Sequence, residues 1–195
     1  MGARVTTKQR MLISAVELLQ ERGAAGVTVD AVLSRSNAPR GSVYHHFPGG
    51  RDQIMTESLD LAGLAIGSIL DSAVSDGPVA ILHRIAEFWA KSLHDSHFRA
   101  GCPVVSIAIA GGPEEEHLNA AVEEIFRHWH DAIANAMVSE GLSEQRASRL
   151  ASTVVAAIEG AVILCRARKS TTPLDDVVVE LESMYTAALP AHTTQ

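Results

Sequence analysis

The chain has few cysteines and no long uninterrupted hydrophobic run. Its 195 residues include two cysteines, Cys102 and Cys165, which are too few for a disulfide framework and favour a reducing compartment. The longest largely apolar runs, such as residues 104–110, fall far short of the roughly 18 residues that a membrane-spanning helix needs. The N-terminal segment is amphipathic, unlike a signal peptide. We therefore expect a cytoplasmic protein with no membrane partner.

Residue patterns typical of catalysis are also missing. We find no Ser/His/Asp arrangement, no glycine-rich phosphate loop and no carboxylate pair at metal-ligand spacing, so we expect neither an enzyme nor a cofactor. Histidines do cluster at positions 94 and 97 and at positions 128 and 130. Neither pair has a carboxylate or cysteine at a matching ligand spacing, so we expect no metal site.

The charge is distributed unevenly along the chain. The formal net charge is −7, which at first sight argues against a nucleic-acid partner. Residues 1–51, however, contain seven basic and three acidic residues and carry +4, while residues 52–195 carry −11. This asymmetry indicates a basic binding region attached to an acidic body.

Nearly every segment has the 3.6-residue hydrophobic period of an amphipathic helix, and no alternating strand pattern is found. We therefore expect an all-α fold. The expected helices cover residues 7–22, 29–35, 40–47, 52 to about 75, 79–95, 104–110, 114–140 and, after a cap at Ser143, residues up to about 168. Thr172 is the expected N-cap of a last helix. The helix at 104–110 is apolar all round, which predicts burial. Glu114, Glu115 and Glu116 fit the acidic first turn of a solvated helix.

Residues 28–47 form the most informative segment. Thr28 stands where a helix N-cap belongs, and Asn37 suits the left-handed conformation of a tight turn between two helices. The second of these helices has two apolar anchors, Val43 and Phe47, among polar residues: Arg40, Ser42, Tyr44, His45 and His46. A short helix that is anchored on one side and polar on the other is typical of a helix-turn-helix domain, whose recognition helix lies in the DNA major groove.

These residues resemble the tetracycline-repressor (TetR) family of bacterial transcription regulators. The resemblance rests on an opening helix that ends at Gly23, on Thr28, and on a third helix that reads RGSVYHHF from residue 40. Two further stretches, residues 47–51 and 101–104, are similar to the branch that includes regulators of lincomycin-type drug resistance. The chain departs from the family pattern at Asn37 and Ala38, and it has one extra residue between Phe47 and Arg51.

The resemblance implies a three-helix DNA-binding domain and a C-terminal helical bundle for a small-molecule effector and dimerisation. We place the boundary after residue 51, with the first domain at 1–51 and the second at 52–195. Carried over to this sequence, the DNA-binding residues are Thr28, Arg40, Gly41, Ser42, Tyr44, His45 and Arg51. Arg40 is the only long cation of the recognition helix, so it is the best candidate for a guanine or phosphate contact. Two such short helices require two half-sites, so the expected partner is a pseudo-palindromic double-stranded DNA operator.

The C-terminal region offers candidates for an effector pocket and a dimer face. Small-molecule sites combine apolar walls with a few polar groups, and the candidate lining residues are Leu59, Trp89, Cys102, His128, Trp129 and Glu159. Glu159 interrupts an otherwise apolar helix, where an acid is costly unless it meets a cation or a polar ligand. Cys102 is open to two interpretations, a buried thiol or an oxidation sensor. The last two long helices carry more apolar surface than one domain needs, which predicts a homodimer through both.

The sequence favours a ligand-responsive transcriptional repressor, with a largely apolar effector that releases it from DNA. Two other classes stay open at this stage: an enzyme built on a helical bundle, and an architectural DNA-binding protein without an effector. Stabilisation by a small molecule would separate the first class from the others, because a bound effector raises the melting temperature.

Overall fold

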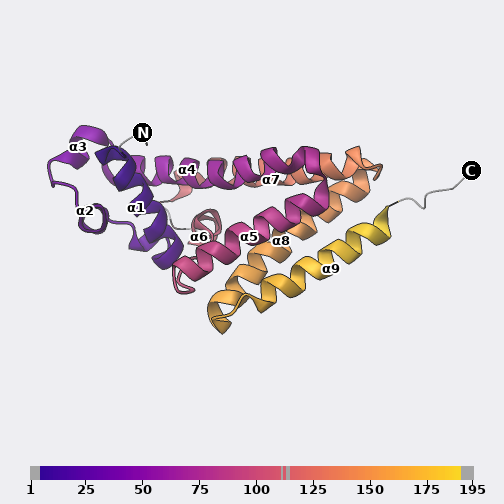
Figure 1. The fold of residues 1–195 in the computed structure, drawn as a ribbon. Coiled ribbons are helices and arrows are strands. Elements are labelled where there is room, and N and C mark those ends of the chain that lie inside the picture. The colour runs from indigo at the N-terminus through magenta and orange to yellow at the C-terminus, as the bar shows by residue number, and fades with distance from the viewer. Residues whose placement is uncertain (1–4, 111, 113–114, 190–195) are drawn as a thin grey trace, which may run out of the picture. The chain divides into compact units, whose positions relative to one another are not determined.

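A computed structural model describes residues 5–110, 112 and 115–189. These residues form helices and connecting segments without a strand (Figure 1), so the all-α prediction is confirmed. The elements, in chain order, are α1 (Thr7–Arg22), η1 (Ala24–Gly26), α2 (Val29–Ser36), α3 (Ser42–His46), α4 (Gly50–Ala73), η2 (Val74–Asp76), α5 (Pro78–Asp95), α6 (Pro103–Ala110), η3 (Glu116–Leu118), α7 (Asn119–Ser139), α8 (Glu144–Arg168) and α9 (Thr172–Ala188), where η marks a 3₁₀ helix.

The described residues divide into two compact units. Unit 1 contains the described residues within Met1–Leu64 and Ala100–Glu123. Unit 2 contains the described residues within Ala65–Arg99 and Glu124–Gln195. Helices α4 and α7 each contribute residues to both units. This division describes compactness alone, and the functional boundary after residue 51 stays a prediction.

In unit 1, α1 is the central helix. A capping box starts it, in which the Thr6 hydroxyl accepts from the Gln9 N–H at 3.2 Å and the Gln9 side chain accepts from the Thr6 N–H at 2.8 Å. This reciprocal pair satisfies two backbone donors that a helix start leaves open. One face of α1 is buried against α2 and α6; its buried apolar residues are Met11, Ala15, Leu18 and Leu19. Ser106 of α6 donates its hydroxyl hydrogen to the Leu19 carbonyl at 3.2 Å.

The turn between α2 and α3 has the conformation that the sequence predicts. Asn37 adopts φ 50° and ψ 41°, the left-handed region, which asparagine enters more readily than most residues. Its backbone N–H closes α2 on the Leu33 carbonyl. The chain can therefore reverse within a few residues and begin α3 after Gly41.

In unit 2, α9 packs against both α5 and α8 (Figure 1). Each of these helices contributes an apolar stripe to the core; examples are Ile81 and Ile85 of α5, Val154 and Ile158 of α8, and Leu174 and Leu181 of α9. The paired residues are four or seven positions apart, which is the period of an amphipathic helix. Unit 2 therefore has its own hydrophobic core.

Some sequence expectations about local structure are wrong. Helix α6 is not buried all round, because the Ile109 side chain is 78% exposed. The helix expected at residues 114–140 begins as α7 at Asn119, after η3. Glu115 is buried and belongs to no solvated first turn, while Glu114 lies outside the described residues. At the other end of the chain, Thr171 and not Thr172 is the N-cap of α9.

Two helices are long and apolar enough to cross a membrane by length and mean hydropathy alone. They are Gly50–Asp76 and Glu144–Arg168, with 44% and 39% of their most apolar windows buried. Serine, glycine and charged residues interrupt both helices, so the search for uninterrupted apolar runs in the sequence predicts neither of them. Core helices satisfy the same test, so this is weak evidence for a membrane protein.

Candidate nucleic-acid interface and ligand pocket

Helix α3 is anchored on one side and open on the other. The side chains of Val43 and Phe47 are fully buried, whereas Tyr44 is 68% exposed. His45 is exposed, and Ser42 and His46 are partly exposed. The Lys8 ammonium of α1 lies 5.3 Å from the centre of the Phe47 ring, so α1 also holds this anchor. The polar side chains of α3 are therefore presented to solvent from a fixed helix.

Two residues beside α3 are accessible to a partner. Arg40 forms an ion pair with Asp30 at 3.1 Å, but the two side chains are 84% and 75% exposed. Such a pair is worth little in water, so the guanidinium can exchange Asp30 for another anion at small cost. Gly41 is exposed, and a Cβ added there would meet open space. The backbone at Gly41 can consequently approach a large surface closely.

Thr28 is the N-cap of α2, as the sequence predicts. Its hydroxyl accepts a hydrogen bond from the Ala31 N–H at 3.1 Å, and its backbone is extended. Thr28 is exposed, and a helix N-terminus favours anions because its first N–H groups and the helix dipole face outward. Thr28 thus combines a capping role with a position suited to a phosphate.

Arg51, by contrast, is directed into unit 1. Its Nε donates to the Val27 carbonyl at 2.9 Å, and Nη2 donates to the Ala24 carbonyl at 3.1 Å. Nη2 also lies 2.8 Å from Glu115 Oε1. These bonds hold the start of α4 to the segment before α2 and to the buried Glu115 carboxylate. The expected contact between Arg51 and a phosphate is therefore not supported, because the guanidinium is engaged inside the protein.

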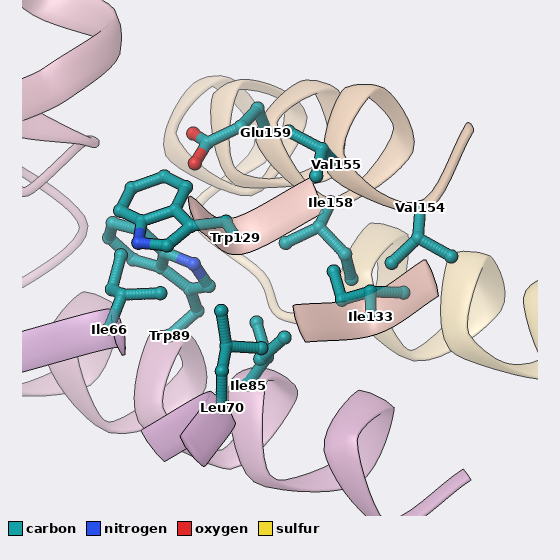
Figure 2. Close-up of a pocket in the computed structure, with 10 residues that line it drawn as sticks. All are labelled: Ile66, Leu70, Ile85, Trp89, Trp129, Ile133, Val154, Val155, Ile158 and Glu159. Atoms are coloured by element: carbon teal, nitrogen blue, oxygen red, sulfur yellow. The ribbon is translucent and has the colours of Figure 1, made fainter. Parts of the chain in front are cut away.

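Unit 2 contains a pocket between four helices, α4, α5, α7 and α8. Its lining residues are Ile66, Leu70, Ile85, Trp89, Trp129, Ile133, Val154, Val155, Ile158 and Glu159. Three candidates from the sequence, Trp89, Trp129 and Glu159, thus come together. Figure 2 shows both indoles and the Glu159 carboxylate toward one end of the pocket, with Ile133 and Val154 toward the other. The pocket is partly open to solvent, and its cavity volume is about 20 Å³, which is room for about one water molecule.

The other three candidates for the ligand pocket do not line it. Leu59 and Cys102 are buried in unit 1. His128 faces a separate, polar hollow of about 270 Å³ in unit 2, which it lines together with Asp71, Glu124, Arg127 and Asp131. Its Nε2 lies 3.5 Å from Asp71 Oδ1. None of the aliphatic lining residues was predicted from the sequence. Hydrophobic periodicity identifies the buried face of a helix, but it does not show which part of that face borders a cavity.

The histidines and cysteines that the structure describes form no cluster that fits a metal. Among the described residues, no three His, Cys, Asp or Glu side chains are grouped so that they could hold an ion. His130 instead bridges α7 and α8, with Nε2 3.0 Å from the Ser148 carbonyl. Both cysteines are buried, and burial raises the pKa of the Cys165 thiol. A buried thiol with a raised pKa is a poor nucleophile.

Two family profiles match the chain, one for each functional part that the sequence suggests. Residues 12–57 match the family described as bacterial regulatory proteins, tetR family. Residues 78–180 match the family described as the C-terminal domain of LmrA/YxaF-like transcriptional regulators. The chain belongs to the TetR family of bacterial transcriptional regulators. Both resemblances that the sequence motifs suggest, to the family and to its lincomycin-resistance branch, are thereby confirmed.

Relatives of the TetR family cover nearly the whole chain. An uncharacterised HTH-type transcriptional regulator of Mycobacterium tuberculosis, Rv0196, is 35% identical over 94% of this chain and 96% of its own length. The HTH-type transcriptional regulator LmrA of Bacillus subtilis is 29% identical over 86% of this chain and 90% of its own. The crystal structure of a regulatory protein TetR from Rhodobacter sphaeroides superposes with a TM-score of 0.80 at 23% identity, covering 91% and 97% of the two chains. This TetR-family chain is thus a helix-turn-helix transcriptional regulator.

Proposed function

We propose that this TetR-family regulator is a repressor that binds a pseudo-palindromic operator as a homodimer and leaves it when a small, largely apolar effector enters unit 2. The observation that carries the DNA-binding part is the two-sided character of α3. Its anchors, Val43 and Phe47, are fully buried, and its polar side chains face solvent. The proposed DNA contacts are Thr28, Arg40, Gly41, Ser42, Tyr44 and His45. Arg51 is left out, because it binds inside unit 1.

Phosphate contacts explain how an acidic chain binds DNA. The net charge of −7 repels the duplex overall, so the positive charge must be concentrated where the contact is made. Residues 1–51 carry +4, and α2 and α3 lie within this segment. Lys and Arg contacts to phosphate release counterions, so the affinity of this interface falls steeply as salt rises.

Helix α4 offers a physical route from the effector to the DNA-binding part. Arg51 in its first turn is bonded to Ala24 and Val27, directly before α2. Ile66 and Leu70, further along the same helix, line the pocket. An effector in this pocket contacts α4 directly, and the Arg51 hydrogen bonds are the route by which a shift of α4 would reach the segment before α2. This is an allosteric coupling between two distinct sites.

The dimer interface that we propose lies on α8 and α9. Both helices leave large apolar side chains exposed: Ile163 at 56%, Leu164 at 46%, Val179 at 60% and Met184 at 40%. A second copy of the chain would cover these apolar side chains and supply the recognition helix for the second DNA half-site. The protein then acts in the cytoplasm, where the DNA is, as a regulator without enzymatic activity.

A gel-shift experiment tests the proposed function. The DNA upstream of the gene that encodes this chain is the probe, and the salt concentration is varied at fixed protein. We expect a retarded complex at submicromolar dimer concentrations, with an affinity that falls as salt rises. The absence of any salt-sensitive complex over that range would overturn the proposal.

A further inference from the structure

An acidic residue lies beside Arg40, the one arginine among the proposed DNA contacts. Asp30 is in the first turn of α2, and its Oδ1 lies 3.1 Å from Arg40 Nη2. Both side chains are exposed. Asp30 therefore lies within reach of any group that binds the Arg40 guanidinium, and its charge acts against the attraction of this surface to DNA, which is a polyanion.

The ion pair of Arg40 differs from the other ion pairs in the DNA-binding part. The side chains of Lys8, Arg35 and Arg51 are also paired with carboxylates, but they are partly buried and each connects separate elements of unit 1. The pair of Arg40 and Asp30 is open to solvent, so it contributes little to the stability of the fold. We therefore look for its role at the binding surface.

The backbone holds the two residues in this arrangement. The Ser42 N–H donates to the Pro39 carbonyl at 2.9 Å, which closes a turn around Arg40. The ring of Pro39 fixes its own φ. Asp30 belongs to the regular helix that leads into this turn. Rotation of the side chains alone can separate the two charges, so the carboxylate stays near Arg40 when the guanidinium binds another partner.

The two candidate partners of Arg40 in DNA differ in charge. A phosphate is an anion, whereas the guanine edge in the major groove presents N7 and O6, two neutral acceptors. A guanidinium has five N–H donors, so it can bind guanine with one edge and remain beside Asp30 with another. A phosphate in the same place would lie close to the carboxylate, and like charges repel. Asp30 thus disfavours the phosphate more than the guanine.

We propose that Asp30 is a positioning residue for sequence recognition, which directs Arg40 to a guanine in the major groove and away from phosphate. This inference rests on the proposed function, because it names what one of the proposed DNA contacts reads. Non-specific complexes depend on phosphate contacts. Asp30 therefore lowers the affinity for random DNA more than the affinity for the operator, and specificity is the difference between the two.

Replacement of Asp30 tests this role. Asp30→Asn should raise the affinity for a random duplex about threefold per subunit, or about tenfold per dimer. The affinity for a selected operator of the same length should change less, so the ratio of the two affinities falls. Fluorescence anisotropy at fixed salt measures both. Asp30→Ser repeats the measurement with a second uncharged side chain that suits a helix start.

The control is Asp60→Asn, which makes the same change of net charge at an exposed acid of α4. It should leave the ratio of the two affinities intact. A ratio that is unchanged in both variants of Asp30 overturns the proposal. A ratio that falls equally in Asp60→Asn shows an effect of net charge alone, and it overturns the proposal as well.

Base preference shows whether Asp30 acts through Arg40. Selection from random DNA should enrich a guanine at one position of each half-site, and this preference should be lost in Arg40→Ala and weakened in Asp30→Asn. In the Arg40→Ala background, Asp30→Asn should alter the preference no further. Replacement of that guanine by 7-deazaguanine, which lacks the N7 acceptor, should weaken binding of the unmodified chain by about fivefold or more. The absence of any guanine preference that depends on Arg40 would overturn the proposal.

The unmodified chain separates this inference from the proposed function. If it binds its operator but Asp30→Asn keeps both the affinity ratio and the guanine preference, the role of Asp30 is overturned and the proposed function stands. If the unmodified chain binds no DNA, the proposed function is overturned and the role of Asp30 with it.

Discussion

The guanidinium of Arg51 lies 2.8 Å from the carboxylate of Glu115, 64 residues further along the chain. Glu115 is buried, and the Arg51 side chain is 24% exposed. The same guanidinium donates to the carbonyls of Ala24 and Val27. One arginine therefore ties together three segments of unit 1: the entry to α2, the first turn of α4 and the residue before η3. A residue that the family pattern suggests for DNA is a structural connector here.

Removal of the Glu115 charge should destabilise the protein. Glu115→Gln removes the carboxylate charge that lies 2.8 Å from the Arg51 guanidinium inside unit 1, and the expected loss is about 1–3 kcal/mol of unfolding free energy. Urea denaturation measures it. The matched control is Glu116→Gln, because Glu116 is the next residue and is exposed; its effect should stay within about 0.5 kcal/mol. Equal stability of Glu115→Gln and the unmodified chain would show that the ion pair contributes nothing.

Replacement of Arg40 should weaken DNA binding without weakening the fold. The Arg40 side chain is 84% exposed, so Arg40→Ala should leave the melting temperature almost unchanged. If Arg40 binds phosphate, the slope of log affinity against log salt should fall by about 1 per subunit. Lys91→Ala, at an exposed lysine of α5, serves as the control and should not alter the slope. An unchanged affinity and slope in Arg40→Ala would remove Arg40 from the interface.

The Thr28 cap should be sensitive to loss of its hydroxyl. Thr28→Ala removes the acceptor that the Ala31 N–H uses, and the expected cost is about 1 kcal/mol of unfolding free energy. Thr28→Ser keeps the hydroxyl and should recover most of that stability. Thermal denaturation of the three proteins provides the comparison. If Ala and Ser variants melt together, the cap is not what stabilises this helix start.

Acid should weaken the link between α1 and α4. Burial acts to raise the pKa of Glu57, but hydrogen bonds from Lys8 and Gln53 and the charge of Lys8 together bring it below its ordinary value of 4.5. A carboxyl group with a lowered pKa in the folded state stabilises the fold above its unfolded pKa. This contribution is lost as the pH falls through the lower, folded value.

The Glu57→Gln variant tests this pH dependence. It should be less stable than the unmodified chain at neutral pH, and the difference should shrink as the pH falls below about 4.5. Urea denaturation at a series of pH values measures the difference. Asp60→Asn, at an exposed acid of the same helix, is the control. A stability difference that is independent of pH would mean that Glu57 acts by packing and not by charge.

Charges on the exposed faces of α8 and α9 should dissociate the proposed dimer. Ile163 and Val179 are 56% and 60% exposed, so their replacement by glutamate disturbs no core packing within the chain. The double variant Ile163→Glu/Val179→Glu should sediment as a monomer and lose operator affinity. Ile109→Glu introduces the same charge at an isoleucine of α6 that is 78% exposed, and it should remain dimeric. A double variant that sediments as a dimer would place the interface elsewhere.

Local signals predicted most of the helices, because the information lies within a few residues. Residues 7–22 form α1 with the predicted bounds, and Thr28 and Asn37 define the two ends of α2. Val43 and Phe47, the only two apolar anchors of α3, also predicted which side of this helix is buried. In each case the hydrophobic period or the cap chemistry acts within one or two helical turns, so the sequence alone carries it.

Contacts between distant residues could not be predicted in this way. Glu115 belongs to an acidic triplet that suggests a solvated helix start, and only the fold brings it to Arg51. The pocket is a similar case: Trp129 and Glu159 line it, but His128, one residue away from Trp129, faces a separate hollow. Neighbouring residues on a helix point about 100° apart, and residue type does not reveal which direction leads to a cavity.

We propose above that α3 reads DNA as part of a two-fold symmetric dimer. The most direct test is the selection of bound sequences from a pool of random double-stranded DNA, with the unmodified chain and with Tyr44→Ala, which removes an exposed side chain of α3. We expect enrichment of a pseudo-palindrome whose half-site centres lie one helical turn, about 10 base pairs, or a multiple of it apart. We also expect a changed preference within each half-site for Tyr44→Ala. A pool that shows no enriched sequence, or only a single unpaired site, would contradict this proposal.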